Sequence, residues 1–565
     1  MRWCIAFRRL FRLDPAICKV VAKACTPALR QGEYPIVSNH PQKAKLVLFL
    51  RSTGRISRLS FSLLTDASQY AFDWECLRMK RLSSIFTLVL AVAGCSLFAA
   101  ANAAGPVNVL FIAADDLRND LGCYGHPMVK TPNLDRLASR GLIFNNAYCQ
   151  QAVCNPSRAC IMTGQRLDRL QIWDLPTHFR TQSADVVTLP EHFKRHGYFT
   201  QNIGKIYHNW IHEVQGDPDS WSVPAVMHFA NHGSDLAIVD GDIPTSSALD
   251  PKCECRDVPD EAYFDGRVAK LAIEALHQCK ARQQPFFLAV GFWKPHSPFN
   301  APKKYWDLYR RDEIPLPKNP GWPSDAPRIA WHNGREIRGD GQRELTPDAI
   351  REIRHGYLAN ISYMDAQIGR VLDELESQQL SENTIVVFWS DHGYHLGEQT
   401  LWAKTSNFEL DARVPLIIAA PKMMTAGQST TSLAELMDLY PTLAELCHLP
   451  RPAAADGVSL MPILENSAAT VRPAALTQHP RPAYYKNAPE SMGYSIRSAT
   501  HRYTEWRDWL TGETTDRELY DHGNDPDETR NLANQSGQEA ELERHAILLK
   551  NIRPIVSPGW KPVLR

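Results

Sequence analysis

Beyond residue 106, short and largely apolar runs alternate with segments of helical periodicity, and this alternation constrains the fold more than any other feature of the sequence. Apolar runs without a polar face are typical of strands that are buried on both faces of a sheet. Strands separated by helices predict an α/β fold with a mostly parallel sheet. The expected strands span residues 107–113, 199–203, 286–292, 384–389 and 414–419.

Helix signals occupy the segments between these runs. Thr131 and Pro132 supply a cap and a first-turn proline, and Gly141 provides a stop. Further helices are expected at 433–446 and near 539–550. A longer helix carries one apolar stripe, which we assign to the core and to no chemistry: Tyr357, Ile361, Met364, Ile368, Val371, Leu372 and Leu375.

The N-terminal residues 1–78 show scattered Arg, Cys and Ser and no sustained period of a helix or strand. Met79 then opens a short basic segment that leads into an apolar run at 85–93, which is the pattern of a secretory signal peptide. The run is shorter than the roughly 20 residues of a membrane span. We therefore expect residues 1–78 to be a mis-called extension and residues 79–104 to be a signal peptide for export, to the periplasm or out of the cell.

Two processing sites compete at the end of this segment. Residues 92–95 (Val-Ala-Gly-Cys) resemble a bacterial lipobox, which would place a lipid anchor on Cys95. Residues 101–103 (Ala-Asn-Ala) fit an ordinary cleavage site, which would release a soluble protein. The sequence leaves both alternatives open, and both predict an exported protein.

The mature chain is expected to contain a main domain at 105–465 and a smaller C-terminal α+β subdomain at 466–565, with short strands at 494–497 and 503–506. Lys plus Arg and Asp plus Glu are equal at 62 each, so no overall field favours nucleic acid and we expect no such partner. The 13 cysteines are scattered and match no zinc-binding spacing.

Polar residues suited to acid–base chemistry or ion binding follow four of the expected strands. In open α/β sheets, ligands bind beyond the carboxyl ends of the strands. Adjacent carboxylates repel each other, so an Asp–Asp pair at a strand end indicates a cation, although a turn or a helix cap explains such a pair equally well when it is taken alone. The residues, in the order of their strands, are Asp115 and Asp116, Lys205 and His208, His296, and Asp391 with His392.

The most specific pattern lies at 154–164. Cys154, Pro156, Ser157 and Arg158 match the C-x-P-S-R signature of sulfatases, and the threonine and glycine that complete it follow at 163–164. With this anchor the chain resembles the type I, formylglycine-dependent sulfatase family, and most of all its iduronate-2-sulfatase branch. The resemblance runs from about residue 108 to about residue 532 and includes the segments 113–118, 204–208, 291–296, 390–398, 402–404 and 518–521.

The resemblance implies an alkaline-phosphatase-like, doubly wound domain with a small antiparallel sheet at its C-terminal end. It implies that a formylglycine-generating enzyme oxidises Cys154 to formylglycine, whose hydrate has one hydroxyl to attack sulfur and a second to expel sulfate. It also implies one calcium ion (Ca2+) per site. Many sulfatases have Asn where this chain has His392, which leaves Mg²⁺ and Mn²⁺ open. The implied metal ligands are Asp115, Asp116, Asp391 and His392, together with the modified Cys154.

The resemblance assigns roles to the other polar residues as well. Arg158 and Lys205 would orient and stabilise the hydrated aldehyde, and His208 would be the base that expels sulfate. His296 and Lys404 would lie on the leaving-group side, where one of them protonates or neutralises the departing sugar oxygen.

Two other functions compete with sulfate ester hydrolysis. A phosphodiesterase or phosphonate monoester hydrolase uses the same modified cysteine, and a non-catalytic glycan-binding relative would keep Cys154 unmodified. For a sulfatase, the substrate is expected to be a sulfated carbohydrate. Iduronate-2-sulfate in a glycosaminoglycan is one candidate and a sulfated algal-type polysaccharide is another, and the loops at 210–224 and 330–347 are expected to decide between them.

Overall fold

The computed structural model describes residues 106–208, 216–228, 253–332, 334–339, 342–484 and 488–552, and the backbone of three strands nearer the N-terminus. The chain divides into two compact units, Met1–Ala103 and Ala104–Arg565. The expected signal peptide at 79–104, including Cys95, lies outside the described residues.

The first unit contains an antiparallel meander of β1 (Pro35–His40), β2 (Lys43–Ser52) and β3 (Arg55–Ser62). The sequence of residues 1–78 shows no sustained strand period, yet these three segments pair. Backbone hydrogen bonds hold a strand pair together, and they do not require a regular alternation of side chains. The interpretation of residues 1–78 as a mis-called extension stays a prediction.

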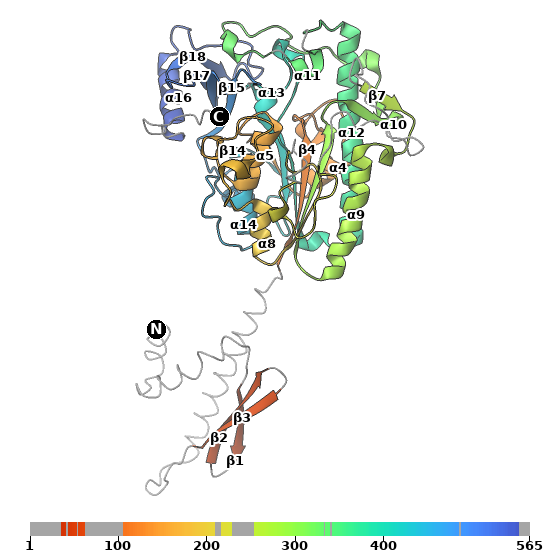
Figure 1. The fold of residues 1–565 in the computed structure, drawn as a ribbon, viewed down its shortest axis with the longest axis vertical. Helices are drawn as coiled ribbons and strands as arrows, with labels where there is room; N and C mark the ends of the chain where they lie inside the picture. Colours follow the sequence, from red (N-terminus) through yellow and green to blue (C-terminus); the bar gives the residue numbers. More distant parts are fainter. Residues whose placement is uncertain are drawn as a thin grey trace. The chain divides into compact units, whose positions relative to one another are not determined.

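The second unit is built on a seven-stranded sheet in the order β14-β5-β13-β10-β4-β8-β6 (Figure 1). Only β13 runs antiparallel to its neighbours, and every other neighbouring pair in this sheet is parallel. The expected mostly parallel α/β sheet is confirmed. Its strands are β4 (Asn108–Asp115), β5 (Leu142–Tyr148), β6 (Phe199–Gly204), β8 (Phe286–Pro295), β10 (Thr384–Ser390), β13 (Arg413–Ala419) and β14 (Ser429–Glu435).

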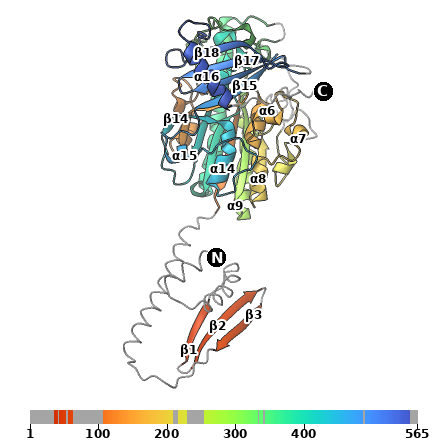
Figure 2. The same ribbon diagram turned by 90° about the vertical axis from the view of Figure 1, so that its left-hand side faces the viewer.

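Helices cover both faces of this sheet (Figures 1 and 2). Leu110 and Ile112 of β4 point into one core with the first group of helices, while Val109 and Phe111 point into the other core, because successive side chains of a strand face opposite sides. The first group is α4 (Pro132–Ala138), α9 (Phe264–Arg282) and α12 (Pro347–Ser377), and the second is α5 (Cys154–Thr163), α8 (Leu189–Arg195) and α14 (Leu439–Leu446).

Two helix boundaries differ from the sequence expectation. Helix α12 begins ten positions before the predicted apolar stripe, because Thr346 caps it by accepting a hydrogen bond from the Ala349 amide. The helix expected at 433–446 begins only at Leu439, since residues 433–435 belong to β14 and pair with β5, and a short 3-10 helix (Leu436–Asp438) follows. An apolar segment of this length fits a buried strand as well as a helix, and pairing with β5 decides.

The C-terminal part is a four-stranded antiparallel sheet of β15 (Ala474–Arg481), β16 (Ser491–Ser498), β17 (His501–Asp508) and β18 (Thr514–Asp521). Helix α16 (Glu539–Ile552) packs against it through Leu549 and its neighbours. The smaller α+β part expected from the sequence is thus present, with longer strands than predicted. None of the helices in the described parts of the chain has the length and apolar character needed to cross a bilayer.

Candidate active site

The carboxyl ends of β10, β4, β8 and β6 meet at one edge of the sheet, because these four strands are mutually parallel. Asp115 ends β4, Asp391 directly follows β10, and Cys154 opens helix α5 beside them. The Cys154 thiol lies 3.5 Å from Asp115 Oδ1 and 3.4 Å from His392 Nε2. Three segments that are far apart in sequence therefore converge on one sulfur atom.

The donor atoms around this sulfur suit a divalent cation. Asp115, Cys154, Asp391 and His392 each offer one ligand atom, and these atoms lie within 4.8 Å of one another. His392 Nδ1 lies 2.9 Å from the Gly393 carbonyl, to which it donates when it carries the proton, and this leaves the Nε2 lone pair directed at the carboxylates. Asp116 Oδ1 lies 3.3 Å from the same Nε2.

The electrostatic environment of Asp115 and Asp116 also fits a cation-binding site. Burial raises the pKa of Asp115, but the field of Lys205, supported by His296 and Arg158, outweighs it and holds the pKa well below its usual range. Burial and the neighbouring carboxylates raise the pKa of Asp116 well above its usual range, against the pull of Lys404. Carboxylates packed this closely repel one another, so a hard cation between them would stabilise their ionised forms.

Arg158 is fully buried and holds the edge of the sheet together. Its Nε donates to Asp391 Oδ2 at 2.8 Å, and one of its terminal nitrogens donates to the Lys205 carbonyl at 2.7 Å. Another terminal nitrogen lies 3.6 Å from Asp115 Oδ1. The guanidinium thus fixes the two acidic strand ends and the segment that follows β6.

Lys205 reaches the cluster because β6 and β8 approach each other very closely at their ends. A Cβ on Gly291 would lie 1.9 Å from the Lys205 carbonyl oxygen, so only glycine fits there. The Lys205 ammonium donates to Asp115 Oδ2, lies 3.6 Å from the Cys154 sulfur and is 4.5 Å from the centre of the Trp293 ring.

A second pair of basic side chains, Lys404 and His296, contacts Asp116. The Lys404 ammonium donates to both Asp116 oxygens, at 3.0 and 2.8 Å, and lies 3.1 Å from His296 Nε2. Lys404 follows the short strand β12 (Trp402–Ala403) rather than a strand of the main sheet. His296 Nδ1 lies 2.5 Å from the Ser297 carbonyl, which directs Nε2 at Lys404.

Glu336, in the short helix α11 (Arg335–Arg338), belongs to this cluster and was missed by the sequence analysis. Its carboxylate lies 2.9 Å from the Lys404 ammonium and accepts hydrogen bonds from Tyr394 and Ser297 at 3.1 and 2.9 Å. Glu336 follows no strand end and belongs to no motif or periodic pattern. The one hint in the sequence is its position in the loop at 330–347, which was expected to influence the choice of substrate.

His208 is half-buried and lies four residues beyond the end of β6, on the same edge of the sheet. Among the described residues, the groups of converging metal-ligand atoms do not include it. The structure brings together at least nine of the ten predicted site residues, and the role of His208 stays a prediction.

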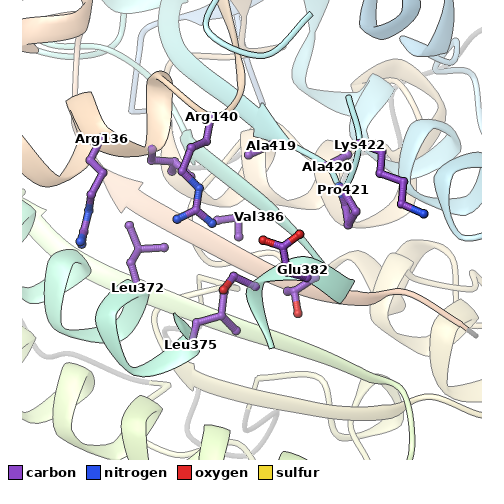
Figure 3. Close-up of a pocket in the computed structure, with 13 residues that line it drawn as sticks. Arg136, Arg140, Leu372, Leu375, Glu382, Val386, Ala419, Ala420, Pro421 and Lys422 are labelled. Atoms are coloured by element: carbon purple, nitrogen blue, oxygen red, sulfur yellow. The ribbon is translucent and has the colours of Figure 1, made fainter. Parts of the chain in front are cut away.

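The opposite edge of the sheet has a different character. A cavity of about 150 Å³ opens near Thr384, at the amino end of β10 (Figure 3). Its polar lining includes Arg136, Arg140, Glu382 and Lys422, without the histidines and cysteine of the other edge. The groups suited to catalysis are thus concentrated at the carboxyl edge.

Cationic side chains that can neutralise an oxyanion, beside carboxylates that can hold a metal ion, define a metal-assisted hydrolase of anionic esters. Comparison with known proteins identifies the family. The Sulfatase family model matches residues 107–449, and the model of the N-sulphoglucosamine sulphohydrolase C-terminal region matches residues 397–552. The chain belongs to the sulfatase family, whose members are sulfuric ester hydrolases.

Individual relatives agree with this assignment. The chain is 34% identical to iduronate 2-sulfatase of Mus musculus over 529 residues, which is 80% of this chain and 94% of the relative. It is also 34% identical to iduronate 2-sulfatase of Homo sapiens over 508 residues, covering 76% of this chain and 92% of that protein.

Solved structures show the same fold at lower identity. One of these proteins was solved in complex with its substrate D-glucosamine-2-N,6-O-disulfate. Its sequence is 23% identical to this chain, with a TM-score of 0.63, and the match covers 79% of this chain and 99% of that one. Phosphonate monoester hydrolase of Agrobacterium radiobacter is 23% identical, with a TM-score of 0.64 over 79% of this chain and 95% of that one. The expected alkaline-phosphatase-like architecture is confirmed.

Proposed function

We propose that this protein hydrolyses sulfate esters of a sulfated sugar or polysaccharide at a nucleophile derived from Cys154. The observation that carries the proposal is the convergence of Asp115, His392 and Lys205 on the Cys154 sulfur. Two iduronate 2-sulfatases among its relatives support a sulfated uronic acid within a glycosaminoglycan as the substrate class, and an algal-type polysaccharide is the second candidate.

The nucleophile is proposed to be formylglycine, made from Cys154 by a formylglycine-generating enzyme. Its hydrate has two hydroxyls on one carbon, so one attacks sulfur and the other, once deprotonated, breaks the bond to sulfate. The unmodified side chain is poorly suited to this task. Burial, and then the charge of Asp115, raise the pKa of Cys154 well above its usual range, so the free side chain is a neutral thiol.

One divalent cation, with calcium as the expected ion, is proposed to bind the modified side chain of Cys154 and four further ligands: Asp115, Asp116, Asp391 and His392. The donor set fits, because three buried carboxylates suit a hard cation and His392 directs its Nε2 at them. When bound, such an ion supplies Lewis-acid polarisation of the sulfate oxygens and makes the attacking hydroxyl more acidic.

The cations of the chain are proposed to divide the remaining work. Arg158 and Lys205 orient the hydrated side chain at position 154, since both contact the strand ends that hold it. Positive groups fixed in a buried site also stabilise the charge that spreads over a sulfuryl group in the transition state. His208 is proposed as the base that deprotonates the second hydroxyl and so expels sulfate.

Lys404 and His296 are proposed to face the leaving group. Asp116 and Glu336 hold the Lys404 ammonium from two sides, and His296 Nε2 contacts it at 3.1 Å. One of these two residues protonates or neutralises the sugar oxygen as the ester bond breaks. Help of this kind is typically worth about 10²–10⁴-fold in rate.

Mass spectrometry of the tryptic peptide that contains Cys154 tests the proposal directly. We expect the aldehyde form in enzyme produced together with the modifying enzyme. An unmodified thiol in fully active protein would refute the proposed nucleophile. An unmodified thiol in inactive protein from cells that carry out the modification would favour a glycan-binding relative.

A phosphodiesterase or phosphonate monoester hydrolase is the second candidate, because a phosphonate monoester hydrolase shares the fold. That likeness is limited to 23% identity, whereas the sulfatases reach 34%. Rates on the sulfate ester and the phosphate esters of one phenol separate the two. We expect the sulfate ester to react faster, and a preference for phosphate would overturn the assignment.

We further propose that residues 79–104 export the protein, which is then lipidated at Cys95 or released after residue 103. N-terminal sequencing of the mature protein distinguishes these products. A mature chain that begins before Met79 would contradict both the signal peptide and the proposed mis-called extension at 1–78.

A further inference from the structure

The C-terminal sheet and helix carry a second convergence of metal-ligand atoms, remote in sequence from the signature cysteine. His501 begins β17, while Glu541 and His545 are one turn apart on α16. Residues four apart on a helix share one face, so the two α16 side chains point toward the same neighbouring strand. The ligand atoms of all three lie within 4.8 Å of one another.

The two distances from Glu541 to the histidine nitrogens match those around a tetrahedral ion. Glu541 Oε1 lies 3.3 Å from His501 Nδ1 and 3.3 Å from His545 Nδ1. A tetrahedral zinc ion with bonds of about 2.0 Å separates its ligand atoms by about 3.3 Å. Two imidazoles and one carboxylate are ligands that zinc takes in sites where a fourth position remains for water.

The hydrogen bonds of His545 leave one nitrogen suited to an ion. Its Nε2 lies 2.9 Å from Ser498 Oγ, which donates its own hydrogen to the His501 carbonyl, so Nε2 can donate to Ser498. In that tautomer the Nδ1 lone pair faces the Glu541 carbonyl oxygen at 2.9 Å and the Glu541 carboxylate. Without an ion, Nδ1 carries the proton and donates to the Glu541 carbonyl, and ion binding would move the proton to Nε2, which then donates to Ser498.

The surroundings of the cluster allow access to an ion. The Glu541 side chain is 28% exposed, so an ion can enter from solvent. Arg544 pairs with Glu541 in the absence of an ion, but its side chain is 53% exposed and can turn away.

Another buried cluster in this region lacks these properties. Glu409, His522 and Glu528 also converge, but the Arg502 guanidinium donates to both of their carboxylates. A fixed buried cation already occupies the position that a metal would need. Among the described residues, the arginine that pairs with the cluster of His501, Glu541 and His545 is Arg544, whose side chain is 53% exposed.

We propose that His501, Glu541 and His545 form a binding site for a divalent d-block cation of the zinc type, which links α16 to β17. The site is distinct from the catalytic cluster, and its ligands serve no step of sulfate ester hydrolysis. Ion binding would stabilise the C-terminal subdomain, because the unfolded chain does not present the three ligands together.

The test uses the full, untagged enzyme, dialysed against buffered Zn²⁺ and then analysed for zinc per chain. His501→Gln and Glu541→Gln remove a ligand at partly exposed positions, where the fold tolerates the change. His277→Gln is the matched control, because His277 is an exposed histidine with a single carboxylate partner at 3.1 Å. Any zinc that binds at the catalytic cluster is present in the wild type and in all three variants. It therefore does not contribute to the differences in zinc content between them.

We expect the wild type and His277→Gln to bind one more zinc per chain than His501→Gln and Glu541→Gln. We also expect Zn²⁺ to raise the unfolding temperature of the first two proteins by a few degrees more than that of the other two. Equal zinc contents in all four proteins would overturn the proposal. Sulfatase activity of the calcium-loaded variants should be unchanged, so a failure of this site is separable from a failure of the proposed function.

Discussion

At the scale of single residues, Cys154 is the position on which the proposed chemistry depends. Cys154→Ala should lower kcat/KM by about 10³-fold or more, because the nucleophile is lost while the small buried side chain keeps the helix intact. Cys154→Ser should be nearly as harmful, since a simple alcohol cannot expel sulfate by forming an aldehyde. Steady-state rates on an aryl sulfate measure both effects.

Cys160→Ala provides the control for these variants. Cys160 is equally buried in the same helix, but it packs in the core on the α5 side of the sheet. We expect this variant to lose some stability through the small cavity and to keep its activity. Similar losses of activity at positions 154 and 160 would show that the helix tolerates no change, and the assignment of the nucleophile would lose its support.

Glu336 is predicted to be a positioning residue that acts through Lys404. Glu336→Gln should lower kcat by about 10- to 100-fold with a smaller change in KM, because a hydrogen bond to a charged group is worth about 1.5–3 kcal/mol. Glu344→Gln is the control, as Glu344 is an exposed carboxylate near the same loop. A loss of stability without a change in kcat would reduce Glu336 to a structural role.

At the scale of elements, Arg481 connects the C-terminal sheet to the catalytic edge. It ends β15 and donates to the carbonyls of Ile329, Ala330 and Thr405, at 2.8, 2.7 and 3.1 Å. Thr405 follows Lys404, and the other two carbonyls lie shortly before α11. The first strand of the C-terminal sheet thus fixes both segments that carry the proposed leaving-group side of the site.

Arg481→Lys should therefore lower kcat about 10-fold while the protein remains folded, because a single ammonium cannot reproduce the planar fork of donors. Arg517→Lys, at an exposed position of β18, serves as the control. Circular dichroism and thermal unfolding check the fold of both variants. Full activity of Arg481→Lys would show that the two segments hold their positions without it.

Glu398 connects three segments of the chain through hydrogen bonds, and one of them is the segment that follows β4. Its carboxylate accepts from Arg118 and Arg354 at 3.1 and 2.9 Å and from the Leu396 amide at 2.7 Å. Although burial opposes it, the field of Arg118 and Arg354 holds the pKa of Glu398 below its usual range. A depressed folded-state pKa gives stability that is present above the unfolded-state pKa and is lost as the pH falls below it.

Glu398→Gln should therefore lower the free energy of unfolding by about 3 kcal/mol at pH 7, because two arginines lose their buried partner. The difference between wild type and variant should shrink as the pH falls below about 4. Urea unfolding at several pH values measures this difference. A difference that is independent of pH would show that the ionised form of Glu398 contributes little.

At the scale of the whole molecule, the proposed cation links strands that are far apart in sequence. Removal of divalent ions with EDTA should suppress activity and lower the unfolding temperature, because Asp115, Asp116 and Asp391 then repel one another in a buried site. Activity should return on addition of Ca²⁺. Indifference of the rate to EDTA would contradict the proposed metal site.

The sequence by itself determined the alternation of strands and helices and the polar residues at the strand ends. Both are local signals, because a buried strand and the polar residue that follows it are consecutive in the sequence. It also determined the signature around Cys154, on which the family resemblance depended. Asp115, Lys205, His296 and Asp391 lie at one edge as expected, because parallel strands bring their carboxyl ends together.

Only the tertiary structure decided the rest. The antiparallel direction of β13, the strand β14 within an expected helix, and the roles of Glu336 and Arg481 all depend on partners far away in the chain. The same is true of the cluster of His501, Glu541 and His545, whose spacing matches no short motif. A local pattern records whether a residue is buried, but which distant group it meets there is decided by the packing of the whole sheet.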